Sequence, residues 1–216
     1  MEEKICAPLF ATILHLDFEI RNPKHPNLDI LVRHIATHTS TLKYTEWYEH
    51  SYLLSEKYPD YSVKYKGKLR KAWKKRTDRY NANVDMPMDQ FVKEIYTPDG
   101  KWFSKDNFLK ASPGTRYTYC NENAALAALV IEGATGIGYK DFVRQHIVDP
   151  LNMKMSSWSL SNYSVEEKGK LYEDQNPLPD YNLITYPDGG FVTSLSDFTT
   201  YFHSILKGHY GDNNIV

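Results

Sequence analysis

The stretch that most constrains the fold is "AALAALVIEGATG", residues 124–136, where Ala, Leu, Val and Ile recur with almost no polar interruption. Asn121 or Asn123 is placed to cap the start of a helix, and Gly133 and Gly136 are placed to end it. A helix that is apolar on nearly every side must be buried. The chain therefore has to supply other elements that surround this helix.

Three further amphipathic segments are candidates for that cover. The sequence predicts a helix at about 29–38 that begins at Asp29, and a second helix that begins near Tyr139 and stops at Pro150. A third helix should run from a serine cap in "SLSDF" to a glycine stop at Gly208. The remaining local predictions are helical stretches near 46–56 and 88–95 and turns at 97–100, 113–117 and 186–190.

Composition excludes several classes of protein. The 216 residues are 41% hydrophobic and 25% charged with a net charge of -1, which is typical of a globular chain without a general attraction to nucleic acid. No apolar run approaches the ~18 residues of a membrane-spanning helix, and the acidic start Met1-Glu2-Glu3 does not resemble a signal peptide. Cys6 and Cys120 lie too far apart for a Cys-x-x-Cys metal site, and they leave the compartment undetermined.

Residues 41–110 are the least regular part of the chain, and we expect a variable insertion on a more compact frame. Between Lys64 and Arg79 there are nine Lys or Arg residues against one Asp, with Tyr65 and Trp73 interleaved. Such a stretch can bind an anionic surface or nucleic acid. A solvated helix face is the more common explanation, and the near-zero net charge favours it, so nucleic acid is not an expected partner.

Five short signatures, taken together and in order, carry a family resemblance. "ILVRHIATHTS" (30–40), "PGTRYTYCN" (113–121), "AALVIEGATG" (127–136), "FVRQHIVDPLNMKMSSW" (142–158) and "YPDGGFVTSLSDF" (186–198) resemble the serine β-lactamase and penicillin-binding-protein superfamily. The likeness is greatest to class C-like esterases and D-alanyl-D-alanine peptidases. It implies an α+β fold in which residues 1–216 form one partial domain, mostly its helical region with little of the central antiparallel sheet.

The resemblance also implies a chemistry and a site. Members of the superfamily form an acyl-enzyme from a lactam, a D-Ala peptide or an ester, without a metal or an organic cofactor, and are often exported. By resemblance, Tyr119 and Asn121 form the Tyr-x-Asn motif, in which Tyr moves a proton and Asn binds the substrate amide. Gly189 and Gly190 resemble the glycine pair that flanks the substrate cleft.

Two other motifs of the superfamily are not found in their expected places. Ser40 and Lys43 have Ser-x-x-Lys spacing but belong to the "HTS" signature, which follows the nucleophile helix in the family. Ser204 and Lys207 come after Tyr119 and near the end of a helix. No Lys-Thr-Gly occurs, and the one His-x-Gly string, His209-Tyr210-Gly211, directly follows the expected glycine stop at Gly208, whereas the family motif lies on a strand well beyond that helix. We therefore expect the central part of a serine hydrolase domain that is inactive alone. A binding or assembly module on the same scaffold is the alternative, and a third hypothesis keeps activity through Ser40 as nucleophile with Lys43.

Missing flanks would leave helix faces uncovered, so the sequence also predicts self-association.

Ordinary structural roles remain open for the candidate residues. Tyr119 and Asn121 can be a packed tyrosine and a helix cap, and Cys120 between them is expected to be buried rather than nucleophilic. His34 and His38 have i,i+4 spacing that suits a metal, but no Glu follows His34, which favours structural hydrogen bonds.

Overall fold

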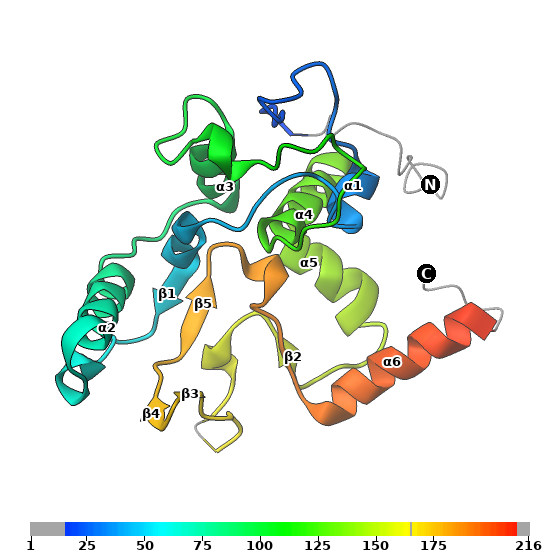
Figure 1. Cartoon of the computed structure of the whole chain (residues 1–216). Helices are drawn as coiled ribbons and strands as arrows, with labels where there is room; N and C mark the ends of the chain where they lie inside the picture. The colour runs from blue at the N-terminus through cyan, green and yellow to red at the C-terminus, as the bar shows by residue number, and fades with distance from the viewer. Residues whose placement is uncertain (1–15, 165, 211–216) are drawn as a thin grey trace.

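The computed structural model describes residues 16–164 and 166–210, so Cys6 lies outside the described residues. Helices dominate, and short strands lie between them (Figure 1). The α-helices are α1 Val32–Ala36, α2 Gly67–Asn81, α3 Met88–Tyr96, α4 Glu122–Thr135, α5 Tyr139–Val143 and α6 Leu195–Tyr210. Shorter turns of helix are η2 Glu46–Ser51, η3 Tyr61–Lys64, η4 Lys105–Asn107, η5 Arg144–Val148, η6 Leu160–Asn162 and η7 Tyr186–Asp188.

The strands form three separate antiparallel pairs among the described residues. They are β1 Tyr52–Leu54 with β5 Tyr181–Leu183, β2 Ser156–Ser157 with β6 Val192–Thr193, and β3 Tyr172–Glu173 with β4 Asn176–Pro177. Within residues 16–164 and 166–210, no larger sheet joins these pairs. The described chain is therefore an α+β fold with mostly helices, as predicted.

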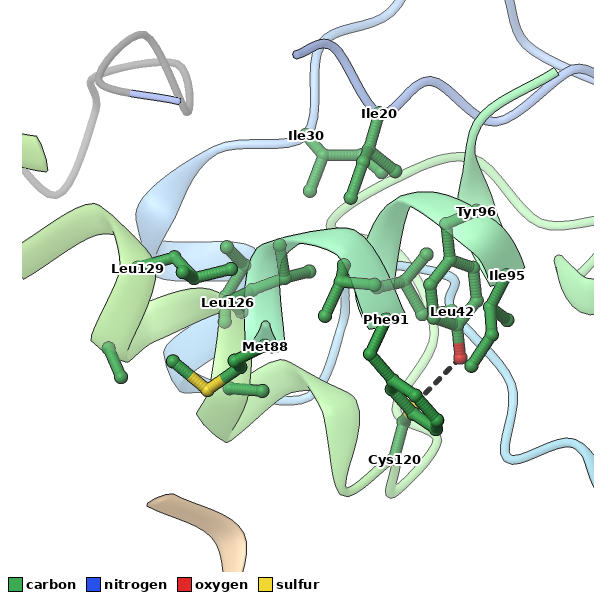
Figure 2. Packing of buried hydrophobic residues seen from close by; sticks show 14 of the residues in the cluster. Ile20, Ile30, Leu42, Met88, Phe91, Ile95, Tyr96, Cys120, Leu126 and Leu129 are labelled. Carbon is green, nitrogen blue, oxygen red and sulfur yellow. Dashed lines mark hydrogen bonds between the residues drawn. The ribbon is translucent and has the colours of Figure 1, made fainter. Parts of the chain in front are cut away.

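The main core lies where α4 packs against α1 and α3. Leu126 of α4 and Phe91 of α3 are fully buried, and Figure 2 shows their side chains among those of the neighbouring elements. Leu42 and Phe108 join this core from two extended segments that meet in an isolated β-bridge. The prediction that residues 124–136 need cover is confirmed for the first part of α4, where Leu126 and Leu129 are buried.

A second, smaller core lies beneath α2. It contains the aromatic residues Tyr58, Trp73 and Tyr80, and α2 packs beside η3 over it. Residues 41–110 thus contribute both to this satellite core and, through α3, to the main core. The boundaries of the insertion stay a prediction.

Several predicted helix limits need correction. The helix expected at 29–38 is only the five-residue α1, and 46–56 divides into η2 and β1. The helix after Tyr139 changes from α to π geometry at Arg144, and α6 continues through Gly208. The segment 88–95 is helical as expected, and Gly136 ends α4 with φ of +70°, a left-handed conformation that glycine adopts without steric cost.

Helix α6 carries an apolar stripe that stays open to solvent. Its side chains at i, i+3, i+7 and i+11 lie on one face, and they are exposed by 82%, 52%, 52% and 41% at Leu195, Phe198, Phe202 and Leu206. Figure 1 shows α6 extending away from α4 and its neighbours. Among the described residues, no helix combines the length and apolarity that crossing a membrane requires.

Candidate active site

Tyr119 lies on the segment that leads into α4, and its side chain is 57% exposed. The ring packs at 4.6 Å, between centroids, against the ring of His38. The backbone fixes this approach, because the Thr118 N–H donates to the carbonyl oxygen of His38 at 2.8 Å. The Tyr119 phenol is thus held beside the start of α4 with its outer part open to solvent.

Asn121 is the N-cap residue of α4, but its side chain makes no capping hydrogen bond. The expectation of an asparagine side-chain cap is therefore wrong for this residue, because its backbone is already helical. Its amide instead faces the Tyr48 hydroxyl of η2. Burial and nearby Asp188 raise the pKa of Tyr48, while the hydrogen bond from Asn121 lowers it.

Tyr48 links this helix start to the turn that contains the glycine pair. Its hydroxyl donates to Asp188 Oδ1 at 3.0 Å. Burial raises the pKa of Asp188 to about 7, and the negative charge of Glu122 adds to the rise, against the nearby Thr185 hydroxyl and the hydrogen bond from Tyr48. The Asp188 carboxyl is therefore partly protonated near neutral pH. No sequence pattern marks this role, since Asp188 fits an ordinary turn and Tyr48 lies in the irregular region.

A buried polar network lies beneath the same helix start. The Cys120 thiol donates to Glu122 Oε2 at 3.1 Å, and Cys120 Sγ lies 3.6 Å from the hydroxyl of Tyr96 (Figure 2 shows this second contact). Burial raises the pKa of both the Cys120 thiol and the Glu122 carboxyl. A thiol whose ionisation is disfavoured is a poor nucleophile. The expectation that Cys120 is a buried structural residue agrees with this geometry.

Ser40 and Lys43 make hydrogen bonds to different partners. The Ser40 side chain is fully buried, and its hydroxyl donates to Asn123 Oδ1 at 2.7 Å. Lys43 Nζ donates instead to the carbonyl oxygen of Asp106 at 2.8 Å. A nucleophile needs access to substrate and a base within hydrogen-bonding reach, so this geometry favours a structural role for Ser40. Ser204, from the second Ser-x-x-Lys string, also has a structural contact, because its hydroxyl donates to the Tyr201 carbonyl oxygen within α6.

Gly189 and Gly190 line a cavity of about 300 Å³. Its walls are largely apolar, and the ion pair of Lys168 with Asp180, at 2.6 Å, also borders it. Gly190 is tightly enclosed, because a Cβ at this position would lie 3.0 Å from the Tyr186 carbonyl oxygen. The main lining side chains are Met155, Leu160, Tyr163, Leu171, Tyr181 and Val192.

The two histidines of α1 and its C-terminal loop do not converge on a common point. His34 Nδ1 accepts from the Leu31 N–H at 3.1 Å, whereas His38 Nδ1 lies 3.1 Å from the Asn123 amide nitrogen. Burial, with the charge of Arg33, lowers the pKa of His34. No cluster of three or more His, Cys, Asp or Glu side chains suited to a metal occurs within residues 16–164 and 166–210.

Sequence comparison agrees with this architecture. The family model described as Beta-lactamase matches residues 14–214. Protein flp of Staphylococcus aureus (strain MW2) is 30% identical over 94 residues, which cover 41% of this chain and 19% of that protein. Penicillin-binding protein 4* of Bacillus subtilis (strain 168) is 24% identical over 180 residues, which cover 77% of this chain and 32% of that protein.

Solved structures show the same fold. An octameric penicillin-binding protein homologue from Pyrococcus abyssi superposes with a TM-score of 0.59 at 19% identity, covering 97% of this chain and 41% of that one. A class C beta lactamase superposes with a TM-score of 0.57 at 14% identity, covering 96% of this chain and 45% of that one. The fold, together with the family match over residues 14–214, thus defines a protein of the serine β-lactamase and penicillin-binding-protein superfamily.

This chain belongs to the beta-lactamase family, as its motif order predicted. It spans less than half the length of the relatives and solved structures described above.

Proposed function

We propose that this chain provides one part of an acyl-transfer site of a β-lactamase-related serine hydrolase and is inactive alone. Tyr119 serves as the proton-transfer residue and Asn121 as the amide-binding residue, and the cavity beside Gly189 and Gly190 receives part of the acyl substrate. The substrate class is a lactam, a D-Ala peptide or an ester.

The observation that carries the proposal is the convergence of three segments at the start of α4. The exposed Tyr119 phenol and the Asn121 amide come from one segment, Tyr48 from η2, and Asp188 with the glycine pair from η7 and the turn after it. A polar group beside a helix N-terminus is suited to bind a carbonyl or carboxylate oxygen. These residues can position and polarise a substrate, but an accessible serine paired with a base is still needed.

Covalent labelling tests the inactivity of the isolated chain. The protein is incubated with a fluorophosphonate and, separately, with a chromogenic cephalosporin, and its intact mass is measured. We expect no added mass, because the Ser40 hydroxyl is buried against Asn123. An adduct that disappears in Ser40→Ala would contradict the proposal and establish Ser40 as the nucleophile.

The coding sequence on either side tests the enzyme assignment against the non-catalytic alternative. A Ser-x-x-Lys before residue 1 and a His-x-Gly or Lys-Thr-Gly after residue 216 would support a hydrolase. In a polypeptide that carries all three motifs, Tyr119→Phe should lower kcat/KM by about 10²-fold or more. Tyr117→Phe is the matched control, because Tyr117 is also exposed and lies two residues away. Equal activity of both variants would exclude Tyr119 from proton transfer.

We also propose that this chain self-associates through the apolar stripe of α6. The stripe presents Leu195, Phe198, Phe202 and Leu206 to solvent. Contiguous apolar surface of this kind is normally covered in a stable protein. The structural neighbour from Pyrococcus abyssi is octameric, which is compatible with assembly.

Sedimentation velocity over a range of concentrations tests self-association. The wild-type chain should show a species larger than a monomer, and Phe198→Ser/Phe202→Ser should shift the distribution to monomer. Val84→Ser is the control, because Val84 is 72% exposed but lies outside α6. A wild-type chain that stays monomeric at high concentration would exclude this interface.

A further inference from the structure

The basic stretch from Lys64 to Arg79 divides into two parts in the structure. In the second part, Lys74 pairs with Asp78, Arg76 with Glu173, and Arg79 with Glu46. Arg76 and Arg79 thus join α2 to other segments, and Lys74 is paired within the helix. In the first part, several lysines have no such ion pair within the described chain.

We define the basic tip as residues 63–72, which comprise the end of η3 and the first turns of α2. It holds five cations and no acidic residue. Within the described chain, the side chains of Lys66, Lys68 and Lys71 have no ion-pair or hydrogen-bond partner. Residues 66–72 are all exposed. In Figure 1 α2 lies at one edge of the molecule, away from α4.

The position of these cations is unfavourable for the isolated helix. The N-terminus of a helix carries a partial positive charge, and the first turn of α2 has no acidic side chain to offset it. Adding Lys68 and Lys71 there increases the repulsion. An anionic partner would remove this repulsion, so the arrangement favours binding to negative charge.

Two exposed aliphatic side chains lie within the same tip. Val63 is 72% exposed and Leu69 is 53% exposed, and η3 packs directly beside α2. Aliphatic side chains among lysines are typical of segments that lie on a membrane surface, where the apolar groups enter the lipid and the cations meet headgroups.

The aromatic residues of this stretch are not available to stack on nucleic-acid bases. Trp73 is only 6% exposed, and the ring of Tyr65 lies parallel to it at 5.2 Å between centroids. Proteins that bind single-stranded nucleic acid use exposed aromatic rings as platforms for bases. The rings here are occupied within the small core beneath α2, which favours a lipid surface over a nucleic acid.

We propose that the basic tip binds this protein to the surface of an anionic lipid bilayer. The cations of residues 64–71 meet the lipid phosphates, and Val63 and Leu69 enter the interface between headgroups and acyl chains. The contact is peripheral and electrostatic, so it weakens as salt increases.

Vesicle co-sedimentation of the full chain tests the proposal. Vesicles of equal parts phosphatidylglycerol and phosphatidylcholine should bind the protein at about 50 mM salt, and vesicles of phosphatidylcholine alone should not. Lys68→Gln/Lys71→Gln should lower the partition coefficient about tenfold or more, because each lysine near an anionic surface contributes about a fivefold change. Val63→Ser/Leu69→Ser should lower it severalfold.

Matched controls separate the tip from general charge and hydrophobicity. Lys101→Gln/Lys105→Gln removes the same charge elsewhere, and Val84→Ser removes an equally exposed valine, so both should bind like the wild type. Circular dichroism confirms that each variant is folded. Equal binding to neutral vesicles, or no loss in Lys68→Gln/Lys71→Gln, would overturn the proposal. Binding to polyphosphate as strong as to vesicles, with Val63→Ser/Leu69→Ser unchanged, would replace lipid with a soluble polyanion.

Discussion

Helices α4 and α6 are similar in length and both carry large apolar side chains, yet the fold treats those side chains in opposite ways. Leu126 of α4 has no exposed surface, whereas Leu195 of α6 is 82% exposed. The difference comes from their neighbours, because α4 packs against α1, α3 and α5 and most of α6 extends away from the other elements. An apolar stripe thus indicates a need for cover but does not identify what provides it.

The largest effect that this comparison predicts is a loss of stability when a buried side chain of α4 is shortened. Leu126→Ala should lower the free energy of unfolding by about 3 kcal/mol, because it opens a cavity in a fully packed site. Leu195→Ala is the matched substitution in α6 and, at a dilution where the chain is monomeric, should change the free energy of unfolding by less than about 0.5 kcal/mol. Urea denaturation measures both. Similar losses in the two variants would mean that α6 is covered in solution.

The half-buried carboxyl of Asp188, in η7 beside α4, gives a pH-dependent effect. Burial raises the pKa of Asp188 to about 7, so the native state holds this proton more tightly than the unfolded state. Its stabilising contribution is complete below about pH 4, the ordinary pKa of Asp, and is lost as the pH rises to about 7. The variant Asp188→Asn has no titrating group at this position, so it lacks this change of stability with pH.

The variant Asp188→Asn should therefore gain stability relative to the wild type between pH 4 and pH 8, by at most about 4 kcal/mol for the full shift and by about 2 kcal/mol when solvent screening of this half-buried group is allowed for. The amide can still accept the hydrogen bond from Tyr48, which makes it a conservative replacement. Urea denaturation at both pH values measures the change. Parallel pH profiles of the two proteins would show that Asp188 titrates normally.

A smaller effect is expected where Ser40 holds the first turn of α4. Its hydroxyl donates to Asn123 Oδ1 in a fully buried position. Ser40→Ala should lower the free energy of unfolding by about 1–2 kcal/mol, because it leaves a buried acceptor without this donor. Thermal denaturation at fixed pH measures the loss. Ser204→Ala is the control, since its hydroxyl bonds only to the Tyr201 carbonyl of its own helix, and an equal loss there would argue against the special role of Ser40.

The smallest effect concerns α6 itself. At high dilution Phe202→Ser should change the free energy of unfolding by less than about 0.5 kcal/mol, because the side chain is half exposed. At high concentration the wild type should gain stability by association, and the variant should not. A wild-type midpoint independent of concentration would leave α6 as an uncovered helix in solution.

Parts of the fold could be predicted because they depend on local pattern. The continuous apolar run marks α4, Gly136 marks its end, and the motif order marks the family. The limits of α1 and the division of 46–56 into η2 and β1 could not be predicted. The strand β1 forms only because it pairs with β5, about 130 residues later in the chain.

The candidate site shows the same division. Its Tyr-x-Asn segment and its glycine pair are each a short contiguous string with a recognisable pattern, although their roles stay predictions. Tyr48 and Asp188 carry no such pattern, and the 3.0 Å hydrogen bond between them joins residues 140 positions apart.

The sequence by itself determined the family, the helical character and the residues that need burial, because these depend on local propensity and motif order. Only the tertiary structure decided which apolar and charged groups found partners. It enclosed Ser40, raised the pKa of Asp188 by removing it from water, and left α6 and the basic tip exposed. The physical reason is that burial and pairing depend on contacts between distant segments, and a linear pattern does not specify those contacts.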